Sequence, residues 1–228
     1  MSQHQIPLAL KPPRRPGFNN FVAGDNQAVV DTLRNGLEDG HWYFLGGPAG
    51  SGRSHLLTAC FAAFNAVAID VAFAGMLAKA NRRLLESLSA RWVILDDVDA
   101  MAGVAEDEMR LFNALNRWRA ERVGVLMSGC SRQAFELPDL RSRLGLAAVL
   151  RLSPLDDAAL TELVRRLAHE HEVILGRGAA EYLVSRSSRQ PGSLAYRMER
   201  LAARALNERR TLSVPLVREL LAEQGPVP

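Results

Sequence analysis

The stretch GGPAGSGRSH, Gly46 to His55, decides the fold of this 228-residue chain. It follows the apolar run WYFL at residues 42–45 and opens a helical pattern from Arg53 to about Phe64. Loops of the form GxxxxGK[ST] need glycine where bare backbone approaches phosphate, and they need a helix start whose N–H groups attract anions. The stretch therefore predicts a phosphate-binding loop, with arginine in place of the lysine.

The departure at Arg53 bears on hydrolysis more than on binding. A planar guanidinium keeps the positive charge, but it is bulkier than an ammonium group and cannot settle between the β- and γ-phosphates in the same way. The chain has 26 arginines and 2 lysines, so compositional drift also explains the change. We expect ADP or ATP as the ligand, with Ser54 as a ligand of Mg²⁺. The residues expected to contact the nucleotide here are Gly47, Pro48, Ala49, Gly50, Ser51, Gly52, Arg53, Ser54 and His55.

A second half of such a site is an acidic pair at the end of another strand. WVILDDVDA supplies Asp96 and Asp97 in the right order along the chain. Asp96 is expected to hold the Mg²⁺ through water, and Asp97 to orient an attacking water. Two aspartates after a strand are also common helix caps, but the loop upstream favours the functional interpretation.

Short apolar runs alternate with helical patterns and predict an α/β fold with a five-stranded parallel sheet flanked by helices. After Pro154 the pattern is helical only, which predicts a small helical domain. The expected domains are a tail at 1–17, an α/β nucleotide-binding domain at 18–153 and the helical domain at 154–228. The expected strands are 42–45, 66–71, 92–97, 123–128 and 147–152, and the expected helices are 25–39, 53–64, 74–88, 105–120, 156–171, 178–187, 193–208 and 214–224.

Composition excludes several classes of protein. The chain has no run of about 18 apolar residues that would span a bilayer, and MSQHQ lacks the build of a secretory signal, so we expect a cytoplasmic protein. Cys60 and Cys130 are expected as buried thiols, and the histidines and cysteines show no metal-ligand spacing. The net charge is −2 over residues 1–114 and +5 over 115–228. Solvated arginine-rich helices explain this better than an acidic partner or nucleic acid.

Three segments resemble the DnaA-related AAA+ family, and most closely its Hda branch, which inactivates the replication initiator DnaA. They are FNNFVAGDNQAVV (18–30), GPAGSGRSHLL (47–57) and ELPDLRSRLG (136–145). The resemblance implies that Phe21 and Val22 flank the adenine base and that Ser128 is a polar sensor. It also marks two departures: Cys130 replaces an expected acidic residue, and Gly192 stands where a sensor arginine is usual, with Arg189 or Arg197 as substitutes. The chain's own ATPase is therefore expected to be weak.

The resemblance identifies Arg143 as the family's arginine finger, which acts on a nucleotide bound by another subunit. It implies a negative regulator of replication initiation that stimulates hydrolysis of DnaA-bound ATP in trans and leaves DnaA in its inactive ADP form. Spacing alone would favour an ordinary surface arginine.

The peptide QIPLAL resembles the QxxLx[LF] motif that docks on the sliding clamp, the beta subunit of DNA polymerase III. Gln5 would bond at the pocket rim, and Leu8 and Leu10 would fill its apolar cleft. Because the chain ends at Pro228 without room for a helix-turn-helix domain, DNA is expected to be reached only through the clamp, placing the protein at the nucleoid. Self-association that covers the nucleotide face is left open.

Two other functions fit the sequence. One is an autonomous AAA+ ATPase, such as a DnaA-like helicase loader, which would hydrolyse ATP itself. The other is a nucleic-acid binder that uses the basic second half, which would show steep salt-dependent binding without the clamp.

Overall fold

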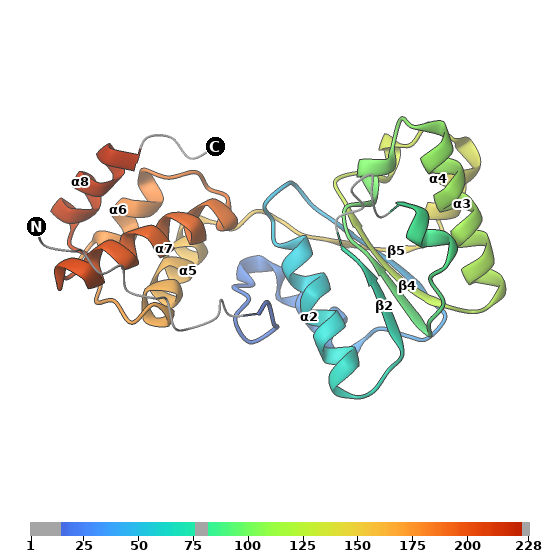
Figure 1. Ribbon diagram of the computed structural model, residues 1–228, viewed down its shortest axis with the longest axis horizontal. Coiled ribbons are helices and arrows are strands. Elements are labelled where there is room, and N and C mark those ends of the chain that lie inside the picture. Colours follow the sequence, from blue (N-terminus) through green and yellow to red (C-terminus); the bar gives the residue numbers. More distant parts are fainter. Residues whose placement is uncertain (1–14, 76–81, 225–228) are drawn as a thin grey trace, which may run out of the picture. The chain divides into compact units, whose positions relative to one another are not determined.

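The computed structural model describes residues 15–75 and 82–224, which divide into two compact units (Figure 1). The first unit, Pro16–Pro154, contains the five strands of the sheet, and the second, from Leu155 onward, is helical in its described part apart from an isolated β-bridge between Leu175 and Leu212. None of the helices in the described ranges is long and apolar enough to cross a membrane.

The first unit is built on a five-stranded parallel sheet, as predicted. Its strand order is β2-β3-β4-β1-β5, so the first strand lies between the fourth and the fifth. The strands are β1 (Trp42–Gly46), β2 (Val71–Ala74), β3 (Trp92–Leu95), β4 (Gly124–Gly129) and β5 (Ala148–Arg151). β1, β3 and β4 are buried along their whole length, which is why they read as continuous apolar runs.

Helices cover both faces of this sheet (Figure 1). On one face, α1 (Gln27–Asn35) and α2 (Arg53–Ala66) enclose a core that includes Leu45, Leu56 and Trp92. On the other, α3 (Ala105–Ala120) and α4 (Pro138–Leu144) enclose a core that includes Phe44 and Trp118. Short 3-10 helices connect these elements: η1 (Gly24–Asn26), η2 (Arg82–Glu86), η3 (Val98–Met101) and η4 (Arg132–Ala134).

The predicted strand at 66–71 and helix at 74–88 are wrong. α2 continues through Ala66, Ala68 turns the chain with a φ of 57°, and the strand occupies Val71–Ala74 instead. In the expected helical region, residues 76–81 lie outside the described residues, and the part that follows is the 3-10 turn η2.

The first helix is shorter than predicted. It ends at Asn35, capped by Gly36, rather than at about Asp39. The Asp39 carboxylate instead accepts hydrogen bonds from the Arg91 guanidinium and from Trp92 Nε1, the latter at 2.9 Å. These bonds, largest from Arg91, hold the pKa of Asp39 below its ordinary value.

The second unit contains four helices close to the predicted ranges: α5 (Asp157–Glu170), α6 (Ala179–Ser185), α7 (Pro191–Glu208) and α8 (Val214–Gln224). Asp156 caps α5 by accepting the Ala159 N–H at 2.7 Å, and Pro191 occupies the first turn of α7. Their apolar faces bury Leu160, Leu183 and Leu194 completely or nearly so. The predicted small helical domain is therefore a packed bundle with its own core.

Candidate nucleotide-binding site

The glycine-rich loop joins β1 to α2 and has the backbone that its sequence predicts. Gly50 and Gly52 adopt φ angles of 76° and 93°, a region that side-chain-bearing residues rarely enter. A Cβ at Gly47 would lie 2.8 Å from Ser51 Oγ, and a Cβ at Gly52 would lie 2.6 Å from Phe21 Cε2. Conformation thus favours glycine at position 50, space favours it at position 47, and both favour it at position 52.

The first turn of α2 is suited to an anion. Gly52 is the N-cap and makes no side-chain cap bond, and Leu56 N–H bonds to the Gly52 carbonyl at 3.0 Å as the helix begins. The amides before Leu56 therefore precede the first helical bond, and they give the helix end its positive character. Ser51 Oγ is buried and has no hydrogen-bond partner among the described residues. The cradle therefore fits a phosphate group.

The two aspartates after β3 lie beside the loop and are linked to β4 through Ser128. The fully buried Ser128 hydroxyl donates to Asp96 Oδ1 at 2.5 Å and accepts the Asp97 N–H at 2.9 Å. Asp96 is 3% exposed, so it sits at the floor of the site. One buried hydroxyl therefore fixes the ends of neighbouring strands on which the two carboxylates stand.

Arg53 lies across the site rather than pointing into solvent. Its side chain is 11% exposed, its Nη2 is 3.4 Å from Asp97 Oδ1, and its Nη1 donates to Cys130 Sγ at 3.3 Å. Asp97 itself has a left-handed backbone, with φ of 60° and ψ of 52°. Arg53 is therefore paired with the carboxylate that was expected to orient water.

Three carboxylates, those of Asp96, Asp97 and Asp99, lie close enough near the end of β3 to repel one another. Burial raises the pKa of Asp97, the Asp99 and Asp96 carboxylates raise it further, and the Arg53 guanidinium opposes the rise. Among the described residues, no three-ligand cluster able to hold a metal ion is present. Magnesium nevertheless fits a site with few protein ligands, because it usually keeps several waters and binds through one or two carboxylates plus substrate phosphates. Ser54 is exposed on the first turn of α2, and the buried Asp96 directly follows β3.

The N-terminal segment packs against the phosphate loop. The Phe21 ring lies over Gly52 and is 5.3 Å from the ring of His55, centroid to centroid. His55 Nε2 is 3.0 Å from the Gly17 carbonyl oxygen, which ties the segment to α2. Val22 is only 8% exposed. The structure thus brings Phe21 to the loop, whereas Val22 is mostly core.

Arg143 is in the last turn of α4 and is half-buried. Among the described residues, no hydrogen bond, ion pair or ring contact holds its guanidinium. The helix that carries it is anchored by Glu108, a buried carboxylate on α3. Its oxygens accept N–H bonds from Gly103 at 2.8 Å, from Glu136 at 2.9 Å and from Leu137 at 2.6 Å.

Glu108 was not predicted from the sequence. Burial acts to raise the pKa of Glu108, but the three N–H donors and the nearby Arg141 outweigh it, and the pKa lies below its ordinary value. The carboxylate is therefore charged inside the fold. An acidic residue on the apolar side of an otherwise amphipathic helix was the signal available, and its partners lie 28 and 29 residues further along the chain.

Other predicted residues have different surroundings. Cys60 is buried, as predicted, and burial raises its pKa to about 12, but Cys130 is exposed, so that prediction was wrong. Cys130 stands just beyond β4, where the strand leaves the core. In the helical unit, Gly192 has open space around it, Arg189 pairs with Asp157 at 2.6 Å, and Arg197 is 7% exposed. Gln5, Leu8 and Leu10 lie outside the described residues.

Comparisons with known proteins agree with this architecture. Residues 152–221 match the family model described as "Hda, lid domain". An uncharacterized protein of Haemophilus influenzae is 26% identical over 227 residues, covering 95% of this chain and 98% of its own.

Solved structures share the fold at low identity. Domain III of the Thermotoga maritima replication initiation protein DnaA superposes with a TM-score of 0.75 at 16% identity, over 93% of this chain and 98% of that one. AMPPCP-bound DnaA from Aquifex aeolicus gives a TM-score of 0.68 at 18% identity, over 83% of this chain and 65% of that one. A Thermotoga maritima RuvB mutant gives 0.67 at 16% identity, over 92% and 73%. The chain therefore has the fold of DnaA domain III and of RuvB, and residues 152–221 of its helical unit match the lid domain of the Hda family.

Proposed function

We propose that this protein is a negative regulator of DNA replication initiation that promotes hydrolysis of ATP bound to DnaA. It holds ADP or ATP in its own site, docks through QIPLAL on the DNA-loaded sliding clamp, and supplies Arg143 to the nucleotide of DnaA. The observation that carries the proposal is a contrast between two arginines. Arg53 is paired with the chain's own Asp97 at 3.4 Å, whereas no described contact engages the guanidinium of Arg143.

The chain's own site favours binding over turnover. Gly47, Gly50 and Gly52 shape the cradle, Phe21 closes one side of it, and Ser54 with Asp96 would hold a nucleotide-bound Mg²⁺. The anionic phosphates of the bound nucleotide would balance the positive character of the loop and of the first turn of α2. Asp97 is paired with Arg53 and its pKa is raised, so it is a poor partner for an attacking water.

Arg143 is suited to act on a nucleotide held elsewhere. Its side chain stands at the end of a short helix that Glu108 anchors, so the backbone that carries the guanidinium is held in place. The guanidinium itself retains free N–H donors. In trans, such a group would stabilise charge that develops on the phosphoryl oxygens during hydrolysis, an effect worth about 10³ to 10⁵ in rate. The chain's own Asp96 and Asp97 do not take part in that step.

The test is release of phosphate from DnaA-ATP with this protein and DNA-loaded clamp. Arg143→Ala should abolish the stimulation while leaving folding, nucleotide binding and clamp binding intact. Arg122→Asn is the control, since Arg122 is an exposed arginine of the same unit and asparagine tolerates its left-handed backbone, with a φ of 56°. Undiminished stimulation by Arg143→Ala would remove the mechanism.

The clamp contact is tested separately. Gln5→Ala combined with Leu8→Ala should eliminate co-migration with the clamp. If stimulation of DnaA's ATP hydrolysis requires the clamp, the double variant should reduce that stimulation as well. Retained co-migration would mean that QIPLAL is not the docking peptide.

An autonomous ATPase is the second candidate, because Ser128, Asp96 and Asp97 form an intact hydrogen-bonded set. Steady-state turnover by the protein alone, lost in Asp97→Asn, would favour it. Asparagine is the suitable replacement because it tolerates the left-handed backbone of Asp97.

A further inference from the structure

The β5 edge of the sheet is open along an apolar and basic surface. β5 is the last strand of the sheet, and three of its four residues are exposed, whereas β1, β3 and β4 are buried throughout. Val149 is 42% exposed, and Leu146, just before the strand, is 51% exposed. An exposed apolar edge strand is a ready template for pairing with another chain.

The register shows which groups of β5 face this edge. Leu152 N–H donates to the Gly46 carbonyl of β1 at 2.8 Å, and Arg151 is the register partner of Gly46. Because backbone groups alternate sides along a strand, Leu150 and Ala148 also point toward β1. Val149 and Arg151 therefore direct their N–H and C=O groups to the open side.

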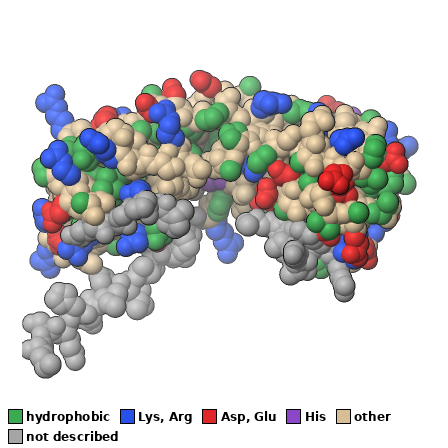
Figure 2. All heavy atoms as spheres, turned by 90° about the horizontal axis from the view of Figure 1, so that it is seen from above, with side chains coloured by type: hydrophobic (Ala, Val, Ile, Leu, Met, Phe, Trp, Pro, Cys, Tyr) green, Lys and Arg blue, Asp and Glu red, His purple; other side chains and the backbone are tan. Residues whose placement is uncertain are grey.

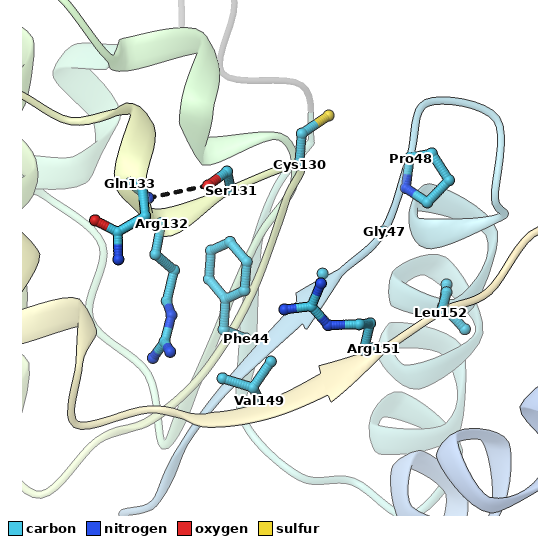
Figure 3. Close-up of a pocket in the computed structure, with 11 residues that line it drawn as sticks. Phe44, Gly47, Pro48, Cys130, Ser131, Arg132, Gln133, Val149, Arg151 and Leu152 are labelled. Carbon is cyan, nitrogen blue, oxygen red and sulfur yellow. Dashed lines mark hydrogen bonds between the residues drawn. The ribbon is translucent and has the colours of Figure 1, made fainter.

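A pocket of about 260 Å³ lies beside the same two residues (Figure 3). It is lined by β1, by Gly47 and Pro48 of the phosphate loop, by the segment that follows β4, by η4 and by β5, and its lining includes Arg132 and Arg151 but no carboxylate. Figure 3 shows the Phe44 ring and Val149 between these two arginines. The pocket is therefore apolar at its base and positive at its sides.

The two arginines differ in how they are held. Arg132 Nη1 donates to the Leu144 carbonyl at 2.9 Å, and its guanidinium carbon lies 5.9 Å from the Phe44 ring centroid. Arg151 is exposed, and no described residue gives it a hydrogen bond or an ion pair. Arg132 thus forms a fixed wall, and Arg151 is available to a ligand.

We propose that the β5 edge and its arginine pocket dock an extended acidic segment of a partner protein. The segment adds as a strand beside β5, bonding to the outward groups of Val149 and Arg151. A carboxylate side chain of the segment reaches Arg151 at the pocket, and an apolar side chain covers Val149. Backbone pairing provides the affinity, and the charge selects the sequence. This inference does not depend on the proposed action of Arg143.

Charge and surface chemistry select this occupant over others. Residues 1–14 of this chain contain no aspartate or glutamate and carry Lys11 and Arg14, so they do not complement the pocket. A nucleic acid would need a row of free cations to track its phosphates, and this edge alternates apolar groups with a single free guanidinium. An extended acidic segment can pair both with the outward N–H and C=O groups of β5 and with the Arg151 guanidinium.

The test uses the full chain and a fluorescein-labelled, end-capped eight-residue peptide of alternating valine and glutamate. Anisotropy gives its affinity, and NMR-detected amide exchange gives the site. Binding should slow exchange at Val149 and Arg151 while leaving Ala148 and Leu150, which already face β1, unchanged. Arg151→Glu should weaken binding at least tenfold. Arg177→Glu is the matched control, because Arg177 is an exposed arginine of the helical unit, and it should change binding less than twofold.

Val149→Pro removes one outward N–H without changing the charge, and it should also weaken the peptide. If Val149→Pro does not fold, Arg151→Glu still tests the proposal. The proposal is overturned if Arg151→Glu binds as well as wild type, or if protection appears away from β5. It is also overturned if a valine–lysine peptide or oligothymidylate binds as tightly as the acidic peptide. Protection of Val149 and Arg151 in the free protein that disappears on deleting residues 1–14 would instead assign the edge to the chain's own N-terminus.

Discussion

Replacing Glu108 with glutamine should destabilise the α/β unit strongly, although the side chain hardly changes size. Glu108 is 1% exposed, and its two oxygens accept N–H groups of Gly103, Glu136 and Leu137. In Glu108→Gln, an amide NH₂ takes the place of one oxygen and faces an N–H donor. One charge-assisted bond is lost, worth about 1.5–3 kcal/mol, and a buried donor is left unpaired, which costs about 1–3 kcal/mol. We expect a loss of about 2.5–6 kcal/mol in the free energy of unfolding.

The loss should depend on pH, with a sign that follows from the depressed pKa of Glu108. A carboxyl whose pKa is lower in the folded state contributes stability above its unfolded pKa, near 4.5, and this stability is lost as pH falls through the folded pKa. The difference between wild type and Glu108→Gln should therefore be full at pH 7 and should shrink below about pH 4.5. Urea unfolding followed by tryptophan fluorescence measures it at each pH.

Glu106→Gln provides the control for this experiment. Glu106 is an exposed residue on the same helix that pairs with Arg110 on the surface, so its loss should change stability by less than about 1 kcal/mol at any pH. The reasoning fails if Glu108→Gln costs less than 1 kcal/mol at pH 7, or if its cost is the same at pH 7 and pH 3.5. A smaller destabilisation by Glu108→Gln that has the same sign at pH 7 and at pH 3.5 would assign the stabilisation to packing rather than to the charge of Glu108.

Three further predictions concern the nucleotide site. Arg53→Lys should raise the basal rate of ATP hydrolysis, because an ammonium cannot bridge Asp97 and Cys130 as the guanidinium does; an unchanged rate of phosphate release would contradict this. Gly52→Ala should weaken binding of a fluorescent ADP analogue at least tenfold, because φ is 93° and Phe21 blocks the Cβ, whereas Gly192→Ala should leave it unchanged. In native protein at pH 8, a thiol reagent should modify Cys130 and spare Cys60, whose pKa is about 12; equal labelling of both would count against the buried position of Cys60.

Most of the sheet could be predicted because its central strands are buried on both faces. WYFL and WVIL are uninterrupted apolar runs, VGVLMS is apolar up to Ser128, and each is a strand within a residue or two of its expected bounds. β2 could not be placed in the same way. AVAIDV is apolar except for Asp70, but Ala66 completes α2 and the chain turns at Ala68 before pairing starts, so the local pattern did not distinguish a helix end from a strand.

The candidate site was predictable where a motif fixes the backbone. The glycines of the loop and the paired aspartates after β3 are close in sequence to the elements that position them. The roles of Arg53 and Glu108 depend on partners 44 and 28 residues away, respectively, so they required the fold. Cys130 was expected inside because it follows an apolar strand, yet it lies past the strand end beside Arg53.

The distribution of arginines separates a protein partner from a nucleic-acid partner. Residues 115–154 carry 7 basic and 3 acidic side chains, whereas 155–228 carry 11 and 10, so the positive surplus of the second half is not on the lid helices. On the face that Figure 2 shows, the described basic side chains lie interspersed with apolar and acidic ones. Several lid arginines are paired with carboxylates: Arg165, Arg166, Arg189, Arg204 and Arg210.

Within residues 115–154, part of the surplus is already used by the fold. Arg117, Arg132 and Arg141 donate to backbone carbonyls. Arg122, Arg143 and Arg151 remain without a described side-chain partner, and the last two stand one at each end of the segment that leads through β5. Two separated guanidiniums beside exposed Leu146 and Val149 would release few counterions from DNA, so its binding would show a shallow salt dependence. The same pair suits a protein surface, where each arginine can engage one anionic group at a defined position.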